Sequence, residues 1–431
     1  MEAWKLAEAV TLRPEAFGGI AFHRNCGITL EVDAEAYHFL HTCLQPRSLP
    51  PPRHPAARLV PQLMHLGFIC PAGVNQGQTT PVPDIPWLGD DLTLSAPETI
   101  HLAITTRCNL SCPGCYVPRP DAGTKSELTS DELCGLIDQW AQMRVFQLAV
   151  GGGEPLLYDG LFDVLACARE RGIVPNLTTN GMLLNADVIR HLVWAGVGRV
   201  NLSWNGPDNR HRGRGQSVLQ ALRMLLNSTL RVGVNLLVTP ALLPHLSQTL
   251  ARLQTLGVQI VTILRPKPPA ISSKPSIAWY NTNRLHRTDL IRLRTILDGW
   301  QGVLRIEVDS ALVSLMGDAD PALLRWRGIH GCTAGRRICT VWPDGRVTPC
   351  SFLADLSVGN VRQTPFAELW KRGENWDALR DHTAQLQSGC TDCDIASQCG
   401  GARCVARHER GDLFAGDAEC PHYLEAAQCV S

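Results

Sequence analysis

Between residues 100 and 264, short apolar segments alternate with segments of helical periodicity, and this alternation limits the fold more than any other feature of the chain. Apolar strands that are each followed by an amphipathic helix pair as a parallel sheet, because the helix carries the chain back over the sheet in a right-handed crossover. The expected strands are residues 100–105, 145–150, 174–179, 199–203, 232–238 and 258–264. The expected helices are residues 131–143, with Thr129 or Ser130 as cap, 161–171, 186–195, 217–226 and 243–256. The sequence therefore predicts an α/β fold whose chemistry lies at the C-terminal ends of the strands.

Three cysteines follow the first expected strand. Cys108, Cys112 and Cys115 lie within the segment CNLSCPGC, and the next cysteine, Cys134, falls inside an expected helix. Three thiolates on one loop can hold three corners of an iron–sulfur cube, which leaves one iron open to a ligand that is not protein. The alternative is a structural zinc site, but such a site normally closes with four cysteine or histidine ligands, and no histidine stands near this loop.

Glycine-rich and polar segments follow the next three strands. The segment GGGEP at residues 151–155 follows the second strand, TTNG at 178–181 the third, and SWNG at 203–206 the fourth. Glycines let the backbone approach another group closely, and Glu154 adds a carboxylate that can accept hydrogen bonds from an ammonium group. Taken singly, GGGEP is about equally typical of an ordinary strand-to-helix turn.

The cysteine loop and the GGGEP segment together resemble the radical S-adenosylmethionine (SAM) enzymes. The resemblance implies a partial (β/α)6 TIM barrel, in which the open iron of a [4Fe–4S] cluster binds the amino and carboxylate groups of SAM. One electron from the cluster then cleaves the sulfonium to a 5′-deoxyadenosyl radical. By the same resemblance, the metal ligands are Cys108, Cys112 and Cys115, and the cofactor-binding residues are Gly152, Gly153, Glu154, Asn180, Ser203, Arg212 and Tyr116.

The chain departs from the pattern of that family at two positions. Asn205 stands where related peptide-modifying enzymes commonly have an aspartate, so an acidic role there is lost. Gly114 stands where family members usually have an aromatic residue or a histidine that meets the adenine. Tyr116 follows the third cysteine instead, so we expect the adenine contacts to differ.

Nine of the seventeen cysteines lie between Cys332 and Cys429. Their spacing, with the segment WPDG at 342–345, resembles the SPASM domain, which binds auxiliary [4Fe–4S] clusters. The resemblance implies three [4Fe–4S] clusters in all, two of them auxiliary. The ligands of the distal auxiliary cluster would be Cys390, Cys393, Cys399 and Cys420, and those of the nearer one Cys332, Cys350, Cys404 and, as a possible fourth, Cys339. A zinc ribbon of paired cysteines is the alternative.

Residues 1–70 are expected to form a small domain of their own. An Asn25-Cys26-Gly27 turn joins two apolar segments into a hairpin, Asp33 can cap a following helix, and Gly67 can end a second helix. This order resembles the winged-helix-like peptide-recognition element of peptide-modifying enzymes. A DNA-binding winged helix is the alternative, but the segment has no basic recognition helix. The expected domains are 1–70, a proline-rich linker at 71–97, the radical SAM core at 98–310 and the SPASM domain at 311–431.

The composition limits the binding partners and the cellular compartment that can be expected for the protein. Lys plus Arg and Asp plus Glu number 40 each, so nothing in the charge calls for nucleic acid or an anionic membrane. No signal peptide or apolar segment of transmembrane length is present, which predicts a cytoplasmic protein. Cytosolic thiols are kept reduced, so the cysteines indicate metal binding and not a disulfide framework. Six cysteines lie outside the ligand sets. Cys429 is expected to be a spare thiol, and the other five are expected to be small buried side chains: Cys26, Cys43, Cys70, Cys134 and Cys167.

These features together predict a radical SAM maturase of a ribosomally made precursor peptide. The N-terminal domain would bind a leader segment by strand addition, and a flavodoxin or ferredoxin-type protein would donate electrons. A C–C, C–O or thioether crosslink is the expected product. Oxidative decarboxylation or backbone excision, a sulfatase-type protein maturase, and a non-catalytic metal-binding peptide scaffold are the alternatives. The sequence identifies no catalytic general base.

Overall fold

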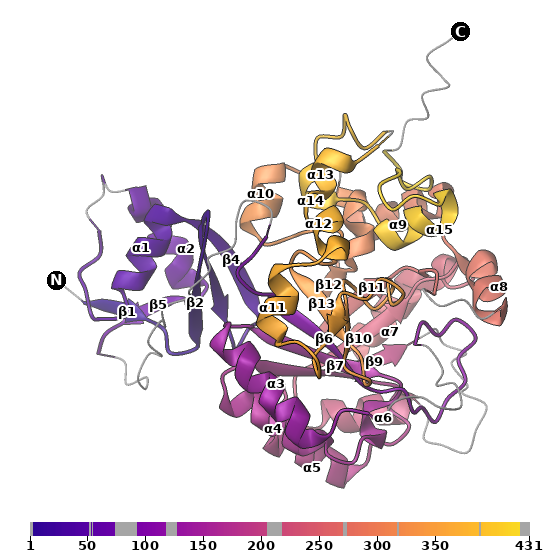
Figure 1. Cartoon of the computed structure of the whole chain (residues 1–431), viewed down its shortest axis with the longest axis horizontal. Helices are drawn as coiled ribbons and strands as arrows, with labels where there is room; N and C mark the ends of the chain where they lie inside the picture. Colours follow the sequence, from indigo (N-terminus) through magenta and orange to yellow (C-terminus); the bar gives the residue numbers. More distant parts are fainter. Residues whose placement is uncertain are drawn as a thin grey trace. The chain divides into compact units, whose positions relative to one another are not determined.

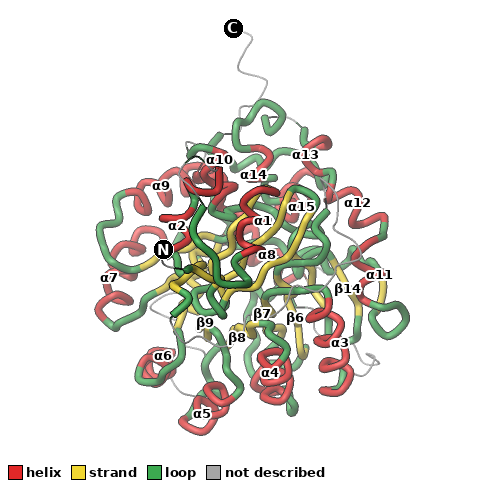
Figure 2. The backbone as a smooth tube through the Cα atoms, turned by 90° about the vertical axis from the view of Figure 1, so that its left-hand side faces the viewer, coloured by secondary structure: helices red, strands yellow, loops and turns green. Residues whose placement is uncertain are grey.

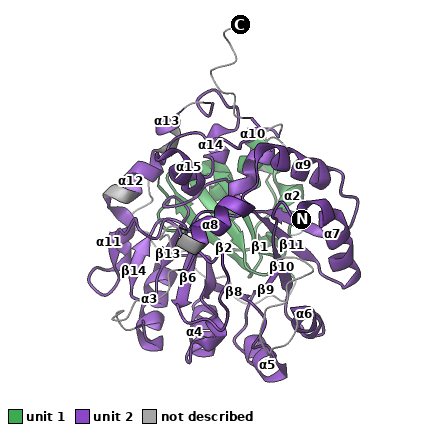
Figure 3. Ribbon diagram, turned by 90° about the vertical axis from the view of Figure 1, so that its right-hand side faces the viewer, with its two compact units in different colours: residues 1–97, 322–329 green, residues 98–321, 330–431 purple. Residues whose placement is uncertain are grey.

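The computed structural model describes residues 3–50, 53, 55–73, 93–117, 127–204, 218–269, 274–316, 319–387 and 389–422. The chain divides into two compact units, each described by itself below (Figure 3). The N-terminal unit comprises residues 1–97 and 322–329, and the barrel unit comprises residues 98–321 and 330–431. The domain bounds expected from the sequence stay predictions.

The barrel unit is built on one ten-stranded sheet with the order β12-β11-β10-β9-β8-β7-β6-β13-β14-β15. Its parallel strands are β6 (Thr99–Thr105), β7 (Gln147–Gly152), β8 (Val174–Thr179), β9 (Arg199–Trp204), β10 (Val232–Leu237), β11 (Ile260–Leu264) and β12 (Arg305–Val308). The first six are the strands expected from the sequence, which confirms the α/β fold and its central parallel sheet. β12 was not expected, because its alternating sequence RIEV has the pattern of an edge strand and no apolar run.

Helices connect these strands and cover the sheet. They are α3 (Ser130–Gln142), α4 (Leu161–Glu170), α5 (Ala186–Trp194), α6 (Val218–Leu226), α7 (Leu246–Thr255), α8 (Lys274–Asn283) and α9 (Arg287–Asp298). Figures 1 and 2 show α3 to α6 side by side along one side of the strands. Thr129 caps α3 as expected: its hydroxyl accepts from the Glu132 N–H at 3.2 Å, and the Glu132 carboxylate accepts from the Thr129 N–H at 2.8 Å.

The C-terminal part of the chain continues the same sheet. β13 (Ile338–Val341) pairs in parallel with β6, and β14 (Arg346–Thr348) and β15 (Gly359–Asn360) follow as antiparallel strands. Gly345 makes the tight turn before β14, since its φ is +84° and a Cβ there would lie 2.6 Å from Asn360 Oδ1. Short helices complete this part: α11 (Phe366–Lys371), α12 (Glu374–Arg380), α13 (His382–Gln385), α14 (Ala396–Cys399) and α15 (Arg403–Arg410).

The N-terminal unit contains two small antiparallel sheets. One has the order β2-β3-β4, with β2 (Val10–Glu15), β3 (Gly18–His23) and β4 (Ile28–Asp33), and the other pairs β1 (Trp4–Leu6) with β5 (Ile69–Pro71). Helices α1 (Ala34–Thr42) and α2 (Val60–His65) pack on them around one apolar core. The expected hairpin is β3–β4, and Asp33 caps α1 by accepting from the Ala36 N–H at 2.8 Å. Gly67 follows α2 with a φ of +75°, as a helix-ending glycine should.

The last residues of the expected linker belong to the packed N-terminal unit. Arg13 and Glu15 form a fully buried ion pair at 2.6 Å on β2. Glu15 also accepts from the Ser95 N–H at 2.7 Å, and Arg13 donates to the Pro97 carbonyl at 3.0 Å. Residues 93–97 are therefore fixed against β2, whereas residues 74–92 lie outside the described part of the chain. No described helix is both long and apolar enough to span a membrane.

Candidate active site

The cysteine loop leaves the C-terminal end of β6, where the sequence places it. Its first turn is organised by Thr105, whose hydroxyl donates to Glu127 Oε1 at 2.6 Å and accepts from the Arg107 N–H at 3.0 Å. Within the loop, the Cys115 N–H donates to the Cys112 carbonyl at 3.3 Å. Cys108 and Cys115 are exposed and Cys112 is half-buried, so the three thiols lie where a bound group can reach them.

The GGGEP segment packs directly on this loop. The N–H of Gly153 donates to the Thr105 carbonyl and that of Glu154 to the Arg107 carbonyl, each at 2.8 Å. A Cβ on Gly153 would lie 2.1 Å from the Arg107 carbonyl oxygen, and Gly152 has a φ of +107°. We expected these glycines to make room for a ligand; the structure shows that they make room for the backbone of the cysteine loop.

Glu154 is a fully buried carboxylate. It accepts from the Thr179 hydroxyl at 2.7 Å, from the Asn180 N–H at 2.9 Å and from the Leu156 N–H at 3.3 Å. Burial raises the pKa of Glu154, although these three hydrogen bonds oppose the rise. No cation among the described residues pairs with it, and a carboxylate has room for about four hydrogen bonds. The site therefore suits a cationic ligand group.

Two of the other expected cofactor-binding residues lie at the ends of β8 and β9, and one lies outside the residues that the structure describes. The Asn180 side chain donates to Asn109 Oδ1 on the cysteine loop at 2.8 Å, which joins the end of β8 to that loop. Ser203 is the half-buried penultimate residue of β9. Arg212, like Asn205, lies outside the described residues.

Tyr116 is half-buried and packs against side chains of the SPASM segment. Its ring centroid lies 4.6 Å from that of Phe352, and it packs on a small apolar cluster that includes Ala103 and Trp342. Burial, with a smaller contribution from Cys115, raises the pKa of Tyr116 to about 12. The adenine contact that we predicted for Tyr116 stays a prediction.

Three of the C-terminal cysteines gather around one apolar patch. Cys332, Cys350 and Cys404 all pack against a cluster that includes Leu353 and Leu379. Burial raises the pKa of Cys350 to about 11 and that of Cys404 well above its usual range, and the other thiols of the group add to both shifts. Buried thiols of this kind ionise only beside cations, as when they bind iron.

Cys339, the possible fourth ligand of this group, lies in the middle of β13 and is fully buried. Burial raises the pKa of its thiol, and Arg380 is the charged group that opposes the rise. The structure groups Cys332, Cys350 and Cys404 on one apolar cluster, and the assignment of Cys339 as a fourth ligand stays a prediction.

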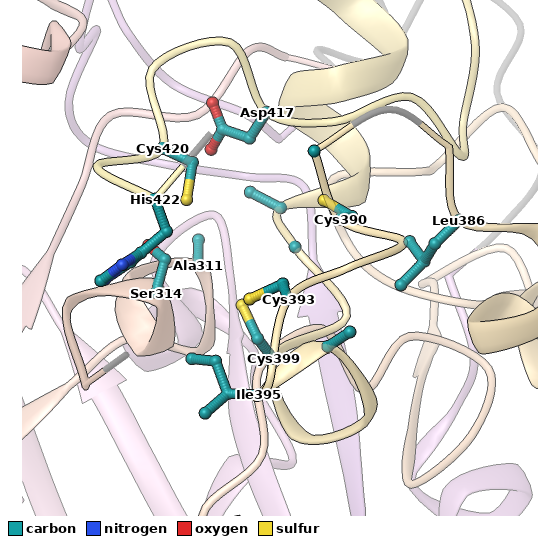
Figure 4. A pocket seen from close by; sticks show the side chains of 14 residues that line it. Ala311, Ser314, Leu386, Cys390, Cys393, Ile395, Cys399, Asp417, Cys420 and His422 are labelled. Atoms are coloured by element: carbon teal, nitrogen blue, oxygen red, sulfur yellow. The ribbon is translucent and has the colours of Figure 1, made fainter. Parts of the chain in front are cut away.

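The remaining four predicted ligands line one pocket (Figure 4). The side chains of Cys390, Cys393, Cys399 and Cys420 surround it, together with Asp417 and His422. Burial raises the pKa of Cys399 to about 12 and that of Cys420 to about 11, and the neighbouring thiols contribute to both shifts. The grouping matches the set that the SPASM resemblance implies for the distal cluster.

Sequence reasoning missed several charged residues that surround these sites. Arg265, just after β11, donates to Asp417 at 2.7 Å in an almost fully buried ion pair. Lys267 pairs at 2.5 Å with Asp309, just after β12, and its ammonium lies 4.4 Å above the Phe352 ring. Their positions past the ends of β11 and β12 are a signal that could have found them, because functional groups of parallel barrels collect there.

Two segments of the chain match known families. Residues 102–247 match the Radical SAM superfamily, and residues 332–394 match SPASM, an iron–sulfur cluster-binding domain. The first segment contains the cysteine loop, GGGEP and TTNG, and the second begins at Cys332. The chain therefore contains a radical SAM domain. Its C-terminal part contains a SPASM domain.

Several proteins of named function are similar to this radical SAM protein. An AdoMet-dependent heme synthase of Methanosarcina barkeri is 25% identical over 76% of this chain and 97% of its own length. A PqqA peptide cyclase of Granulibacter bethesdensis is 26% identical over 78% of this chain and 91% of its own length. Streptococcus suis SuiB, solved with its precursor peptide SuiA, has a similar fold: the TM-score is 0.71 at 15% identity, over 97% of this chain and 99% of SuiB.

Radical SAM and SPASM domains bind iron–sulfur clusters and SAM, and the residues present fit these groups. The loop offers three accessible thiols, Glu154 is a buried carboxylate without a cation partner in the described part of the chain, and four cysteines line one pocket. No three His, Cys, Asp or Glu side chains of the described residues converge on a single metal ion. A cluster is compatible with this spacing, because each of its thiolates binds a different iron.

Proposed function

We propose that this protein is a radical SAM/SPASM maturase that crosslinks residues of a ribosomally made precursor peptide. The carrying observation is a contact between the segments that follow the two cysteine sites: Tyr116 follows Cys115, and its ring lies 4.6 Å from that of Phe352, two residues after Cys350. A substrate bound at this contact would be near both segments. The similarity to PqqA peptide cyclases, and the fold of SuiB with its bound precursor peptide, support a peptide substrate.

Three [4Fe–4S] clusters would serve the reaction. Bound at Cys108, Cys112 and Cys115, the first cluster and SAM supply a 5′-deoxyadenosyl radical that removes a hydrogen atom from the substrate. The nearer auxiliary site would use Cys332, Cys350 and Cys404, with Cys339 as a possible fourth ligand. The distal site would use Cys390, Cys393, Cys399 and Cys420. A flavodoxin or ferredoxin-type protein would supply the reducing electron.

The residues of the chain have defined tasks in this scheme. Glu154 holds the ammonium group of SAM, because it is the buried carboxylate beside the cysteine loop and has no cation partner among the residues that the structure describes. Asn180, with Ser203 and Arg212, completes the cofactor site at the ends of β8 and β9. Tyr116 and Phe352 keep water from the space between the clusters, and Lys267 with Asp309 supplies one fixed charge pair at its edge.

The N-terminal unit would bind the leader segment of the precursor. Its β2-β3-β4 sheet has two edges, and an extended peptide can add to such an edge as a further strand. Binding there would raise the effective concentration of the core peptide at the barrel. A precursor without its leader should therefore be modified poorly, while reductive cleavage of SAM continues.

A second candidate substrate is a tetrapyrrole. AdoMet-dependent heme synthases are as similar to this chain as the peptide cyclases are, at 25% identity. Oxidative decarboxylation of propionate side chains would use the same cofactors. The N-terminal unit weighs against this candidate, because the fold likeness to SuiB extends over 97% of this chain.

The test is anaerobic co-expression with a small precursor peptide encoded beside this protein, followed by mass spectrometry. A crosslink removes two hydrogen atoms from the peptide, oxidative decarboxylation removes carbon dioxide together with two hydrogen atoms, and backbone excision removes a larger fragment. Cys112→Ala is the matched inactive control. Modification of a tetrapyrrole but of no peptide would overturn the proposal in favour of the second candidate.

A further inference from the structure

The cysteine loop is in contact with an aromatic residue that is distant in the sequence. A Cβ built on Gly114 would lie 2.2 Å from Cε3, 2.4 Å from Cζ3 and 2.6 Å from Cδ2 of Trp279, which is on α8. All three atoms belong to the indole ring, so the ring lies against the Gly114 backbone, between Cys112 and Cys115. Any larger residue at 114 would displace it.

The position of Trp279 is fixed by the rest of α8. The hydroxyl of Tyr280, the next residue, donates to Glu409 at 2.8 Å, and Arg284 donates to the same carboxylate oxygen at 2.8 Å. Tyr280 is almost fully buried. Glu409 belongs to α15, the helix that also carries Cys404. Helix α8 is thus held from the SPASM side while its indole ring rests on the cysteine loop.

Trp279 also keeps part of its surface open. It is half-buried, like Tyr116 beside the third cysteine, but the Tyr116 ring is in contact with the Phe352 ring. An indole that is fixed on one face and open elsewhere offers a surface on which a flat base can stack. SAM held by the loop would be bound beside this ring, because Gly114 belongs to the same loop.

We propose that Trp279 is the aromatic contact for the adenine of SAM and that Gly114 leaves the space for it. Trp279 would bind the adenine although it lies outside the cysteine loop and the GGGEP, TTNG and SWNG segments. The proposal rests on the radical SAM domain of the chain and not on the identity of the substrate. It can therefore be tested without any peptide.

The test measures cofactor binding to the full chain after anaerobic reconstitution of the clusters. Calorimetry gives the affinity for SAM, and the spectrum of the reduced first cluster reports the binding of S-methylmethionine, which keeps the amino acid and the sulfonium but has no adenosyl group. Trp279→Ala should weaken SAM binding about tenfold and leave the S-methylmethionine effect and the iron content unchanged. Trp279→Phe should keep most of the affinity. Trp194→Ala, which removes an exposed indole on α5, is the control.

A double-mutant cycle separates this role from simple packing. Gly114→Ala should weaken SAM binding by displacing the ring, and it should have little further effect once Trp279 is alanine. An unchanged affinity for SAM in Trp279→Ala would overturn the proposal. Equal losses for SAM and S-methylmethionine, or loss of iron, would overturn it too, because they would show that the ring only supports the loop.

Discussion

The ring centroids of Tyr116 and Phe352 lie 4.6 Å apart, and the two rings are tilted by 36°. Tyr116 directly follows Cys115, and Phe352 lies two residues after Cys350. The contact therefore joins the chain segment of the first cysteine site to that of the nearer SPASM site. Residues 116 and 352 are far apart in the sequence, so this closeness is a property of the fold.

The two groups of cysteine sites should be separable by mutation. Cys112→Ala should abolish reductive release of 5′-deoxyadenosine and lower the iron content by about four of about twelve per chain. Cys399→Ala should instead keep that release, because its pocket is separate from the loop. Iron analysis and chromatography of the nucleoside check both. Full release by Cys112→Ala would refute the assignment of the loop.

Glu154→Gln should weaken SAM binding by about 10- to 100-fold, because it removes a charge-assisted hydrogen bond of about 1.5–3 kcal/mol. The same residue should leave a signature in the cofactor-free protein. Its folded-state pKa is raised, so the folded protein loses stability as pH rises above the unfolded-state pKa toward the folded one. Chemical unfolding at several pH values should show this component in the native chain and not in the variant. Native affinity for SAM in Glu154→Gln would contradict the assigned role.

Arg265→Met should destabilise the barrel unit by about 3–5 kcal/mol, because Asp417 would be left as an unpaired buried charge. Asp417 also accepts the Cys420 N–H through its carbonyl at 2.9 Å, so the iron of the distal site should be lost first. The double variant Arg265→Met with Asp417→Leu should regain much of the stability. Denaturant unfolding gives the stability of the native protein, the single variant and the double variant. A single variant as stable as the native protein would show that the pair contributes little.

His101 on β6 should make the protein less stable in mild acid. Burial and the nearby Lys267 lower its pKa to about 4, against the smaller opposing effect of Asp309. The unfolded chain then binds the proton more tightly, so stability is complete above the unfolded-state pKa of about 6.5 and falls as pH drops toward 4. Between pH 7.5 and 5.5 the loss should be about 1 kcal/mol, and His101→Gln should lack it. Urea unfolding of the native protein and of His101→Gln at both pH values measures this loss of stability. Equal losses in the native protein and the variant would contradict the assignment to His101.

Local patterns predicted the parts of the structure that depend on neighbouring residues. The capping box of Thr129 and Glu132, the cap at Asp33 and the six strands follow from spacing and periodicity alone. The grouping of Cys390 with Cys393, Cys399 and Cys420 followed from resemblance to a family, and the structure brings these residues to one pocket.

Contacts between distant segments were beyond such patterns. Lys267 and Asp309 are ordinary loop residues until β11 and β12 pair and bring their ends together. Trp279 reads as part of a helix, and only the fold places its ring on Gly114. The full burial of Cys339 arises because β13 pairs with β6, which spacing alone does not reveal.

The parallel pairing of β13 with β6 has a further consequence. Cys339 is in register with Ile100, so the strand that leads to the first cysteine site and the strand that leads to the SPASM site are neighbours in one hydrogen-bonded sheet. Changing the distance between the two sites would require breaking that ladder. The spacing of the two strands that lead to these sites is therefore fixed by the sheet and not by the loops.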